Sequence, residues 1–394
     1  MQPQLPPELI ETVIEEIGDH SSSLRACSLV SNAFAVISQR RLFRFVHLKS
    51  PMAGVLATSP HLASYVRDLH IHLVLDEEHQ DGLRKAIWLL KNVHRLTITA
   101  VWEGPCAWDS FAANLTGSLV SLCTSSSLRC LAFYNLRRVP LVLIRHALLS
   151  CEELCLVVED VDIHNDVVLP GTSQDTRYLT HLRLDYSPVQ DPALHALLID
   201  DKMIPILARL EDLELTVRGS VDTSLLGFEP IALKSEPCLQ HLTMNFGKIL
   251  VYREGPGNPV RLPFLPNLRV VTLEANVDEL RIPASILHTI TSLPSSVPNL
   301  ETLHIVLTAV RENAPTGEVF GRCNLSEVAA TITTGLPCLR AVHWYIFCDA
   351  AETFEAHVRK SLPLPGVSTF FSTSTEGTKY HPMSVFLDSA QLTR

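Results

Sequence analysis

One short phrase recurs along this chain and limits what it can fold into. The phrase is apolar-x-x-apolar-x-apolar, and five clear copies begin at Leu179, Leu210, Leu239, Leu268 and Leu300. Successive copies start 31, 29, 29 and 32 residues apart. A fixed period of this length is typical of stacked repeats, in which each unit buries its apolar face against its neighbours.

Five looser copies extend the repeat toward both ends. They are Val66 to Ile71, Val93 to Ile98, Leu128 to Phe133, Cys151 to Leu156 and Leu339 to Trp344. Within each copy the apolar residues alternate with others, as in a half-buried strand, and helix-like stretches such as Leu83 to Leu90, Leu141 to Leu149 and Ile204 to Leu210 lie between copies. One strand and one helix per repeat predict a curved parallel α/β solenoid over residues 49–394.

The strand positions between the apolar residues predict a binding surface. Because side chains alternate along a strand, these positions all face the concave side of such a solenoid. Their charges are mixed, which suits a protein target better than a polyanion, although solvated strand residues that bind nothing would show the same pattern. The candidate target-binding residues are His70, Arg183, Glu214, Thr243, Thr272, His304 and His343.

The first residues of the chain predict a helix ahead of the repeats. Pro6 and Pro7 can open a helix because its first N–H groups have no partner inside it, and Glu8 suits the positive end of the helix dipole. Gly18 ends the pattern. The residues spaced to form one buried face are Leu9, Ile10, Val13, Ile14 and Ile17.

Two further apolar sets complete a small helical head, residues 1–48. Candidate N-caps at Ser21 to Ser23 precede a second helix, one side of which is lined by Leu24, Cys27, Val30, Ser31 and Phe34. The third set comprises Val36, Ile37, Leu42, Phe43 and Val46. Three short helices bury only a limited core, so such a unit commonly depends on a partner or on the rest of its chain.

The head resembles the F-box family, whose pattern is Leu-Pro-x-Glu, a spaced apolar pair, a second helix ending near an aromatic residue, and Leu-aromatic. Phe34 and Phe43 stand where many members have Trp. The resemblance implies docking of the apolar helix faces to the adaptor Skp1, and through it to a cullin. The alternative is an ordinary helical cap on the repeats. The matching residues are Leu5, Pro6, Glu8, Leu9, Val13, Ile17, Leu24, Cys27, Val30, Phe34, Leu42 and Phe43.

The repeat region resembles the leucine-rich-repeat family in an irregular form with long repeats. The Asn or Cys that normally follows the strand in that family is mostly missing here. Prolines instead precede four of the strands, at Pro237, Pro266, Pro298 and Pro337, where they forfeit no ladder hydrogen bond. A different α/β stack is the alternative.

The charge and composition of the chain limit which classes of partner it can bind and which cellular compartment it is expected to occupy. The net charge of −10 opposes nucleic-acid binding, which favours a basic surface. No apolar stretch reaches membrane-spanning length and no secretory leader is visible, so we expect an intracellular protein of the cytoplasm or nucleus. Ten cysteines without Cys-x-x-Cys pairs suit reduced thiols, and Cys151, Cys238 and Cys338 are expected to be small core residues.

The sequence predicts no catalytic, cofactor or metal site. His-Glu-x-x-His and Gly-x-Ser-x-Gly are absent, and the 17 histidines are interpreted as ordinary strand residues. Asp160 to Asp166 resembles a calcium loop but has Asn165 and Gly171 where glycine and glutamate are needed. Gly255 to Pro259 lacks the Lys-Ser/Thr of a phosphate loop. Trp102 to Trp108 is a candidate partner-binding loop, although a loop whose aromatic residues fold back on the adjacent repeat is the more frequent case.

The combined prediction is an adaptor and not an enzyme: a three-helix F-box-like head followed by an α/β solenoid. We expect a substrate-recognition subunit of a Skp1–cullin–F-box ubiquitin ligase, whose solenoid binds an unidentified target protein. Two alternatives stay open, a repeat scaffold for protein–protein interaction that recruits no ligase, and a hydrolase or transferase in an irregular α/β domain. Residues 361–394 are either a C-terminal cap or a loose tail.

Overall fold

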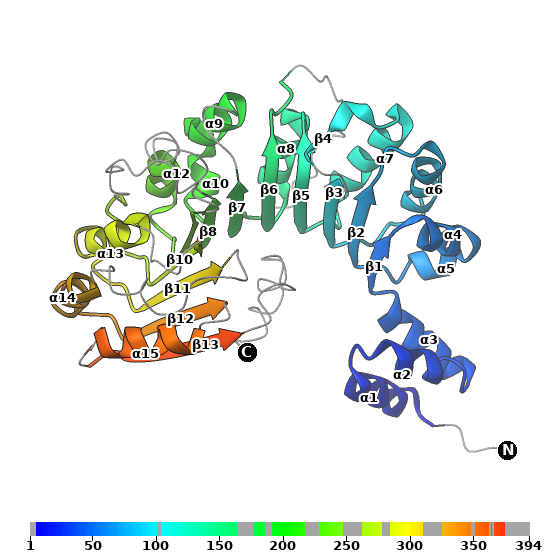
Figure 1. The fold of residues 1–394 in the computed structure, drawn as a ribbon. Coiled ribbons are helices and arrows are strands. Elements are labelled where there is room, and N and C mark those ends of the chain that lie inside the picture. The colour runs from blue at the N-terminus through cyan, green and yellow to red at the C-terminus, as the bar shows by residue number, and fades with distance from the viewer. Residues whose placement is uncertain are drawn as a thin grey trace. The chain divides into compact units, whose positions relative to one another are not determined.

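The structure is a computed structural model, and it describes residues 5–100, 104–163, 177–185, 191–216, 228–246, 262–277, 284–309, 325–347, 351–361, 364 and 366–374. Contacts divide the chain into two compact units, Met1–Leu179 (unit 1) and Thr180–Arg394 (unit 2). Figure 1 shows helices along one side of the strands in each unit. The predicted boundary after residue 48 stays a prediction.

Three helices form the head of unit 1: α1 (Pro7–Ile17), α2 (Ser21–Cys27) and α3 (Asn32–Leu42). Pro7 opens α1 as expected, and Gly18 ends it with a φ of 63°, a conformation that costs glycine little. Ser31 caps α3 by accepting a hydrogen bond from the Phe34 backbone N–H. The core of the head is Ile10, Ile14 and Leu24, against which Ile17, Cys27, Phe34, Ile37 and Leu42 are packed.

Two details of the predicted head are wrong. The apolar stripe of α1 is not one buried face, since Ile10 and Ile14 are buried while Leu9 and Val13 are exposed. The second helix does not run on to Phe34, because α2 ends at Cys27 and Phe34 lies in α3. Spacing alone cannot distinguish a stripe that covers a core from one whose edge is left uncovered.

The strands of unit 1 form a parallel sheet in the order β1-β2-β3-β5-β6, with β4 beside β5. Two residues separate the end of α3 from the start of β1, so the sheet starts within the range predicted for the head. The strands are β1 (Phe45–Leu48), β2 (Asp68–Leu73), β3 (Arg95–Ala100), β4 (Cys106–Ala107), β5 (Cys130–Arg137) and β6 (Glu153–Glu159).

Helices alternate with these strands. Asp76 caps α6 by accepting a hydrogen bond from the His79 N–H at 2.8 Å. The helices are α4 (Ser50–Thr58), α5 (Pro60–Ala63), α6 (Glu77–Ile87), the short 3₁₀ turn η1 (Trp108–Ser110), α7 (Ala113–Cys123) and α8 (Leu141–Ser150).

Unit 2 continues the same pattern with seven described parallel strands in sequence order. They are β7 (His181–Asp185), β8 (Asp212–Thr216), β9 (His241–Asn245), β10 (Val270–Val277), β11 (Thr302–Ala309), β12 (Ala341–Phe347) and β13 (Ser368–Ser374). The helices are α9 (Pro192–Ile199), η2 (Asp201–Met203), α10 (Ile204–Leu207), α12 (Phe228–Ser235), α13 (Ala284–Ser296), α14 (Leu325–Gly335) and α15 (Ala351–Ser361).

All ten predicted repeat phrases contain a strand, and each unit is a leucine-rich-repeat-like parallel α/β solenoid. Burial alternates along the strands, as in Asp68–Leu73, where Leu69, Ile71 and Leu73 are buried and the residues between them are not. Strand β13 extends the sheet into the predicted C-terminal segment, of which residues 375–394 lie outside the described part. No helix among the described residues is long and apolar enough to cross a membrane.

Side-chain amides link successive repeats just before the strands. The Asn267 amide donates to the carbonyls of Glu236 and Pro237 in the preceding repeat, and the Asn299 amide donates to Pro266 at 2.8 Å. In unit 1, the Asn92 amide donates to the Ser64 carbonyl at 3.1 Å. These bonds occupy backbone carbonyls that the strand ladder does not use, which is the role that the missing post-strand asparagine would have had.

Candidate functional site

The candidate site is the open face of each sheet, meaning the strand face whose side chains alternate with those buried under the helices. In unit 2 the strand registers align six predicted target-binding residues in one continuous row, one on each strand from β7 to β12. The row is Arg183, Glu214, Thr243, Thr272, His304 and His343. The seventh predicted residue, His70, lies on β2 of unit 1 opposite Thr97.

A largely buried ion pair begins this row. Arg183 Nε lies 3.1 Å from Glu214 Oε1, and their side chains are only 17% and 10% exposed. Burial raises the pKa of Glu214 to about 7; Arg183 opposes the shift, while Glu274 and Asp185 add to it. Burial likewise raises the pKa of Glu274. The row therefore begins with a carboxyl group that changes charge near neutral pH.

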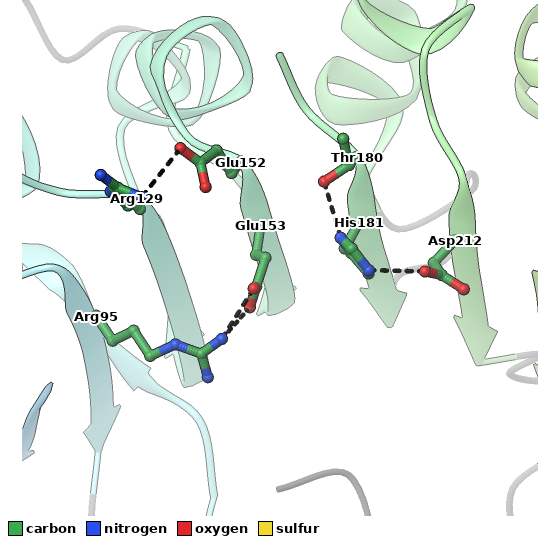
Figure 2. Close-up of polar contacts among 7 residues, drawn as sticks. All are labelled: Arg95, Arg129, Glu152, Glu153, Thr180, His181 and Asp212. Atoms are coloured by element: carbon green, nitrogen blue, oxygen red, sulfur yellow. Dashed lines mark hydrogen bonds and ion pairs between the residues drawn. The ribbon is translucent and has the colours of Figure 1, made fainter. Parts of the chain in front are cut away.

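Beside the ion pair, one aspartate bridges two histidines. Asp212 accepts hydrogen bonds from His181 at 2.7 Å and His241 at 2.5 Å, and Figure 2 shows the contact with His181. Burial alone would raise the pKa of Asp212, but the two histidines overcome that effect and hold its pKa well below the usual range. The hydrogen bond to Asp212 in turn raises the pKa of His241. These two contacts link the neighbouring strands β7, β8 and β9.

Aromatic rings form the other end of the row. His304 stacks on His343 with ring centroids 4.8 Å apart, and His343 stacks on Phe370 at 4.6 Å. Tyr345 lies beside both histidines. Burial lowers the pKa of His304, to about 4, with His343 and His241 adding to the effect. The rings of this end are therefore an uncharged platform for apolar or aromatic side chains.

Two contributors to the unit 2 face were absent from the predicted set. Phe370 is half exposed and extends the row onto β13, and Asp212 lies two residues before the predicted Glu214 on β8. The signal for Phe370 was weak because its strand carries no clear copy of the repeat phrase. Asp212 occupies a flanking position of a clear phrase, yet only the strand register pairs it with His181 and His241.

The open face of unit 1 carries a different charge pattern. Arg95 of β3 reaches across β5 and donates to both carboxylate oxygens of Glu153 of β6, at 2.8 and 2.9 Å. Figure 2 shows this pair and, near it, Arg129 beside Glu152. The predicted residue His70 hydrogen-bonds Thr99 Oγ1 through Nε2 at 2.9 Å. This face is therefore polar and cross-linked along its rows.

Some of the predicted docking residues of the head are packed in its core, and others are exposed. Leu24 is buried, and Ile17, Cys27, Phe34 and Leu42 are packed against the core, with Phe43 half-buried. Pro6 is exposed. The exposed apolar side chains of the predicted set are Leu5 (56%), Leu9 (52%), Val13 (46%) and Val30 (67%).

The predictions for the tryptophan loop, the two other loops and the cysteines have different outcomes. Trp108 is buried and meets the Phe133 ring edge-on, so it packs in the core; Trp102 lies outside the described residues. Residues 164–171 of the calcium-like loop and the segment from Gly255 to Pro259 also lie outside them. Cys151 is buried as predicted, but Cys238 and Cys338 are exposed and the core prediction for them is wrong.

The chain matches no protein-family model and no curated protein. Among solved structures it is similar to an internalin (InlF) of Listeria monocytogenes, at 12% sequence identity over 92% of each chain. The TM-score of 0.32 is too low for this likeness to support an argument about function. The repeat architecture therefore rests on the strand order and registers of the two units.

Proposed function

We propose that this chain is a substrate-recognition adaptor of a Skp1–cullin–F-box ubiquitin ligase. In this proposal the head docks to a Skp1-type adaptor, and the open face of the repeats binds a target protein. The chain makes and breaks no bond itself. It raises the effective concentration of a target lysine near the ubiquitin-loaded enzyme.

The exposed apolar side chains of the head are the main support for the proposal. Leu9, Val13 and Val30 stand at apolar positions of the F-box pattern, and all three are exposed, while Ile10, Ile14 and Leu24 supply the core. Apolar side chains of this size are normally covered when the fold allows it, and a group of them on a small helical unit marks an interaction surface. A head that served only as a cap would have no need of an uncovered apolar edge.

The unit 2 face supports a protein target. It combines the buried pair Arg183–Glu214 with the aromatic platform of His304, His343 and Phe370. Aromatic side chains and arginine are enriched where proteins bind tightly, whereas a nucleic-acid face would be rich in uncompensated lysine and arginine. The overall charge of −10 agrees with this choice.

Binding of the purified chain to purified Skp1 tests the proposal. The informative variant is Leu9→Ser with Val13→Ser, because both side chains are exposed and outside the head core. We expect nanomolar to micromolar binding by the wild type and a loss of at least about 100-fold in the variant. Circular dichroism and thermal unfolding show whether the variant stays folded.

The matched control replaces exposed apolar residues away from the head. Trp88→Ser and Leu149→Ser remove two such side chains from the repeats and should leave Skp1 binding unchanged. Equal loss in both variants would mean nonspecific apolar adhesion. Absence of binding by the wild type would reject the ligase role and favour the alternative, a repeat scaffold that recruits no ligase.

A further inference from the structure

Three histidines of unit 1 converge on the open face. His47 lies on β1, and His70 and His72 lie on β2. Each offers a ring nitrogen, and the three nitrogens all lie within 4.8 Å of one another. Ring centroids are 5.0 Å apart for His47 and His70, 5.7 Å for His47 and His72, and 4.2 Å for His70 and His72.

The strand register explains why these residues meet. His47 is the register partner of His70, although 22 residues separate them in the sequence. His70 and His72 are two positions apart on one strand, so their side chains point to the same face. A sequence search for closely spaced histidines therefore finds only the His70–His72 pair and interprets it as strand surface.

The geometry points to a binding site for a borderline transition-metal ion, with Zn²⁺ as the best match, held by His47, His70 and His72. Imidazole suits this class of ion, and three protein ligands with a fourth position left to water is a common zinc arrangement. At a Zn–N distance of about 2.0–2.1 Å, tetrahedral ligand nitrogens lie roughly 3.3 Å apart. Binding would require side-chain rotations that shorten the present separations, which are at most 4.8 Å, by up to about 1.5 Å.

The protonation and orientation of the rings agree with this assignment. Burial lowers the pKa of all three histidines, that of His70 to about 4, and Lys49 adds to the shift in each case. Neutral imidazole is the form that binds metal, so protons compete less here. With Nε2 of His70 hydrogen-bonded to Thr99 Oγ1, its Nδ1 can serve as the ligand.

Nearby charges set limits on the affinity. The Lys49 ammonium lies close enough to disfavour positive charge on all three rings, and it opposes a bound cation in the same way. His79 contacts the His72 backbone oxygen through Nε2 at 3.2 Å and also disfavours charge on His72. Removing the Lys49 charge should therefore strengthen metal binding at this site, whereas metal binding at a site far from Lys49 would not change.

A bound ion would act on the edge of the sheet. Strand β1 is the first strand, follows α3 directly and pairs only with β2 among the described strands. An ion shared by His47 and His70 would cross-link β1 to β2 beside the head. This role is independent of whether the head binds Skp1.

The test uses the full chain with Zn²⁺ alone in isothermal titration and with Co²⁺ in visible absorption. We expect one ion per chain and an intense tetrahedral cobalt spectrum without thiolate charge-transfer bands. His47→Gln and His72→Gln should each weaken binding by more than the roughly 10- to 100-fold typical of losing an outer hydrogen-bond partner. Lys49→Gln should tighten binding several-fold.

The matched control is His304→Gln with His343→Gln, which removes a histidine pair of similar ring spacing from unit 2. This double variant should bind the metal as the wild type does. The triple variant His47→Gln/His70→Gln/His72→Gln provides the decisive comparison. If it binds the metal as tightly as the wild type does, or if its cobalt spectrum equals that of the wild type, the assignment is overturned. Thiolate bands in the spectrum would transfer the site to cysteines and reject it equally.

Discussion

Arg183 and Glu214 are register partners on β7 and β8, and the carboxyl of this pair keeps a proton to about neutral pH despite a guanidinium 3.1 Å away. Burial of the carboxyl outweighs the attraction, as occurs when desolvation costs more than a single ion pair returns. The open face of unit 2 is therefore sensitive to pH through a residue in its central row.

Glu214→Gln should reduce the dependence of stability on pH. The folded-state pKa of Glu214, about 7, lies above the ordinary 4.5. The stability that the protonated carboxyl contributes is therefore complete below about pH 4.5 and is lost as pH rises through 7. Between pH 5 and pH 8 the wild type should lose on the order of 2 kcal/mol that the variant keeps. Urea unfolding at several pH values measures this. The control Glu229→Gln, an exposed site, should follow the wild type.

Asp212→Asn should destabilise unit 2 mainly at mildly acidic pH. The raised pKa of His241 gives stability below its ordinary value of 6.5 that disappears as pH rises through the folded-state value. The lowered pKa of Asp212 gives stability above 3.8 that disappears as pH falls. Both are present between these limits, where we expect a loss of about 1 kcal/mol, which shrinks as pH rises through the raised folded-state pKa of His241. Asp201→Asn, at a 93% exposed side chain, should show no such profile.

Adjacent residues of α1 should respond very differently to truncation. Ile14→Ala removes a buried side chain from the head core and should cost roughly 2–5 kcal/mol. Val13→Ala removes an exposed one and should cost less than about 0.5 kcal/mol. Native-state amide hydrogen exchange of α1 and α3 reports the opening of the head directly. Similar costs at both positions would contradict the division of this helix into a core side and an uncovered side.

Two glycine-to-alanine changes should have opposite signs. A Cβ at Gly335 of α14 would lie 2.5 Å and 2.8 Å from two ring carbons of Pro294 in α13, so Gly335→Ala should cost about 1–3 kcal/mol. A Cβ at Gly117 inside α7 meets nothing within 4 Å, so Gly117→Ala should gain roughly 0.5–1 kcal/mol. Thermal unfolding of the two variants tests both. A stabilised Gly335→Ala would mean that the two helices are less closely packed.

The repeat phrase predicted the strands well because it reflects two requirements of burial, alternation within one strand and the same alternation in the next. Leu182 and Leu184 must alternate with Arg183 to be buried on one side, and the next copy must repeat that pattern to bury the same layer. The same alternation placed Arg183, Glu214 and His304 on the open face. Where the phrase is weak, as at Phe45–Leu48 and Ser368–Ser374, the sequence did not indicate a strand.

In the head, the helical spacing of apolar residues does not predict which of them are buried. Leu9 and Val13 share the spacing of Ile10 and Ile14, but only the packing of α2 and α3 decides which pair is covered. Cys151 is the first apolar residue of its phrase and is buried, whereas Cys238 directly precedes the phrase that begins at Leu239 and is exposed. Helical spacing defines a stripe, whereas burial depends on what lies against it.

The sequence by itself determined the parallel α/β repeat and the face to which each strand residue points, because both follow from a local two-residue alternation repeated along the chain. Tertiary structure alone decided which residues on that face meet. His47 joins His70 and Asp212 joins His241 only through the register of neighbouring strands. Register depends on how each helix packs beneath the sheet, and that packing sums many weak contacts between distant residues, which no short stretch of sequence contains.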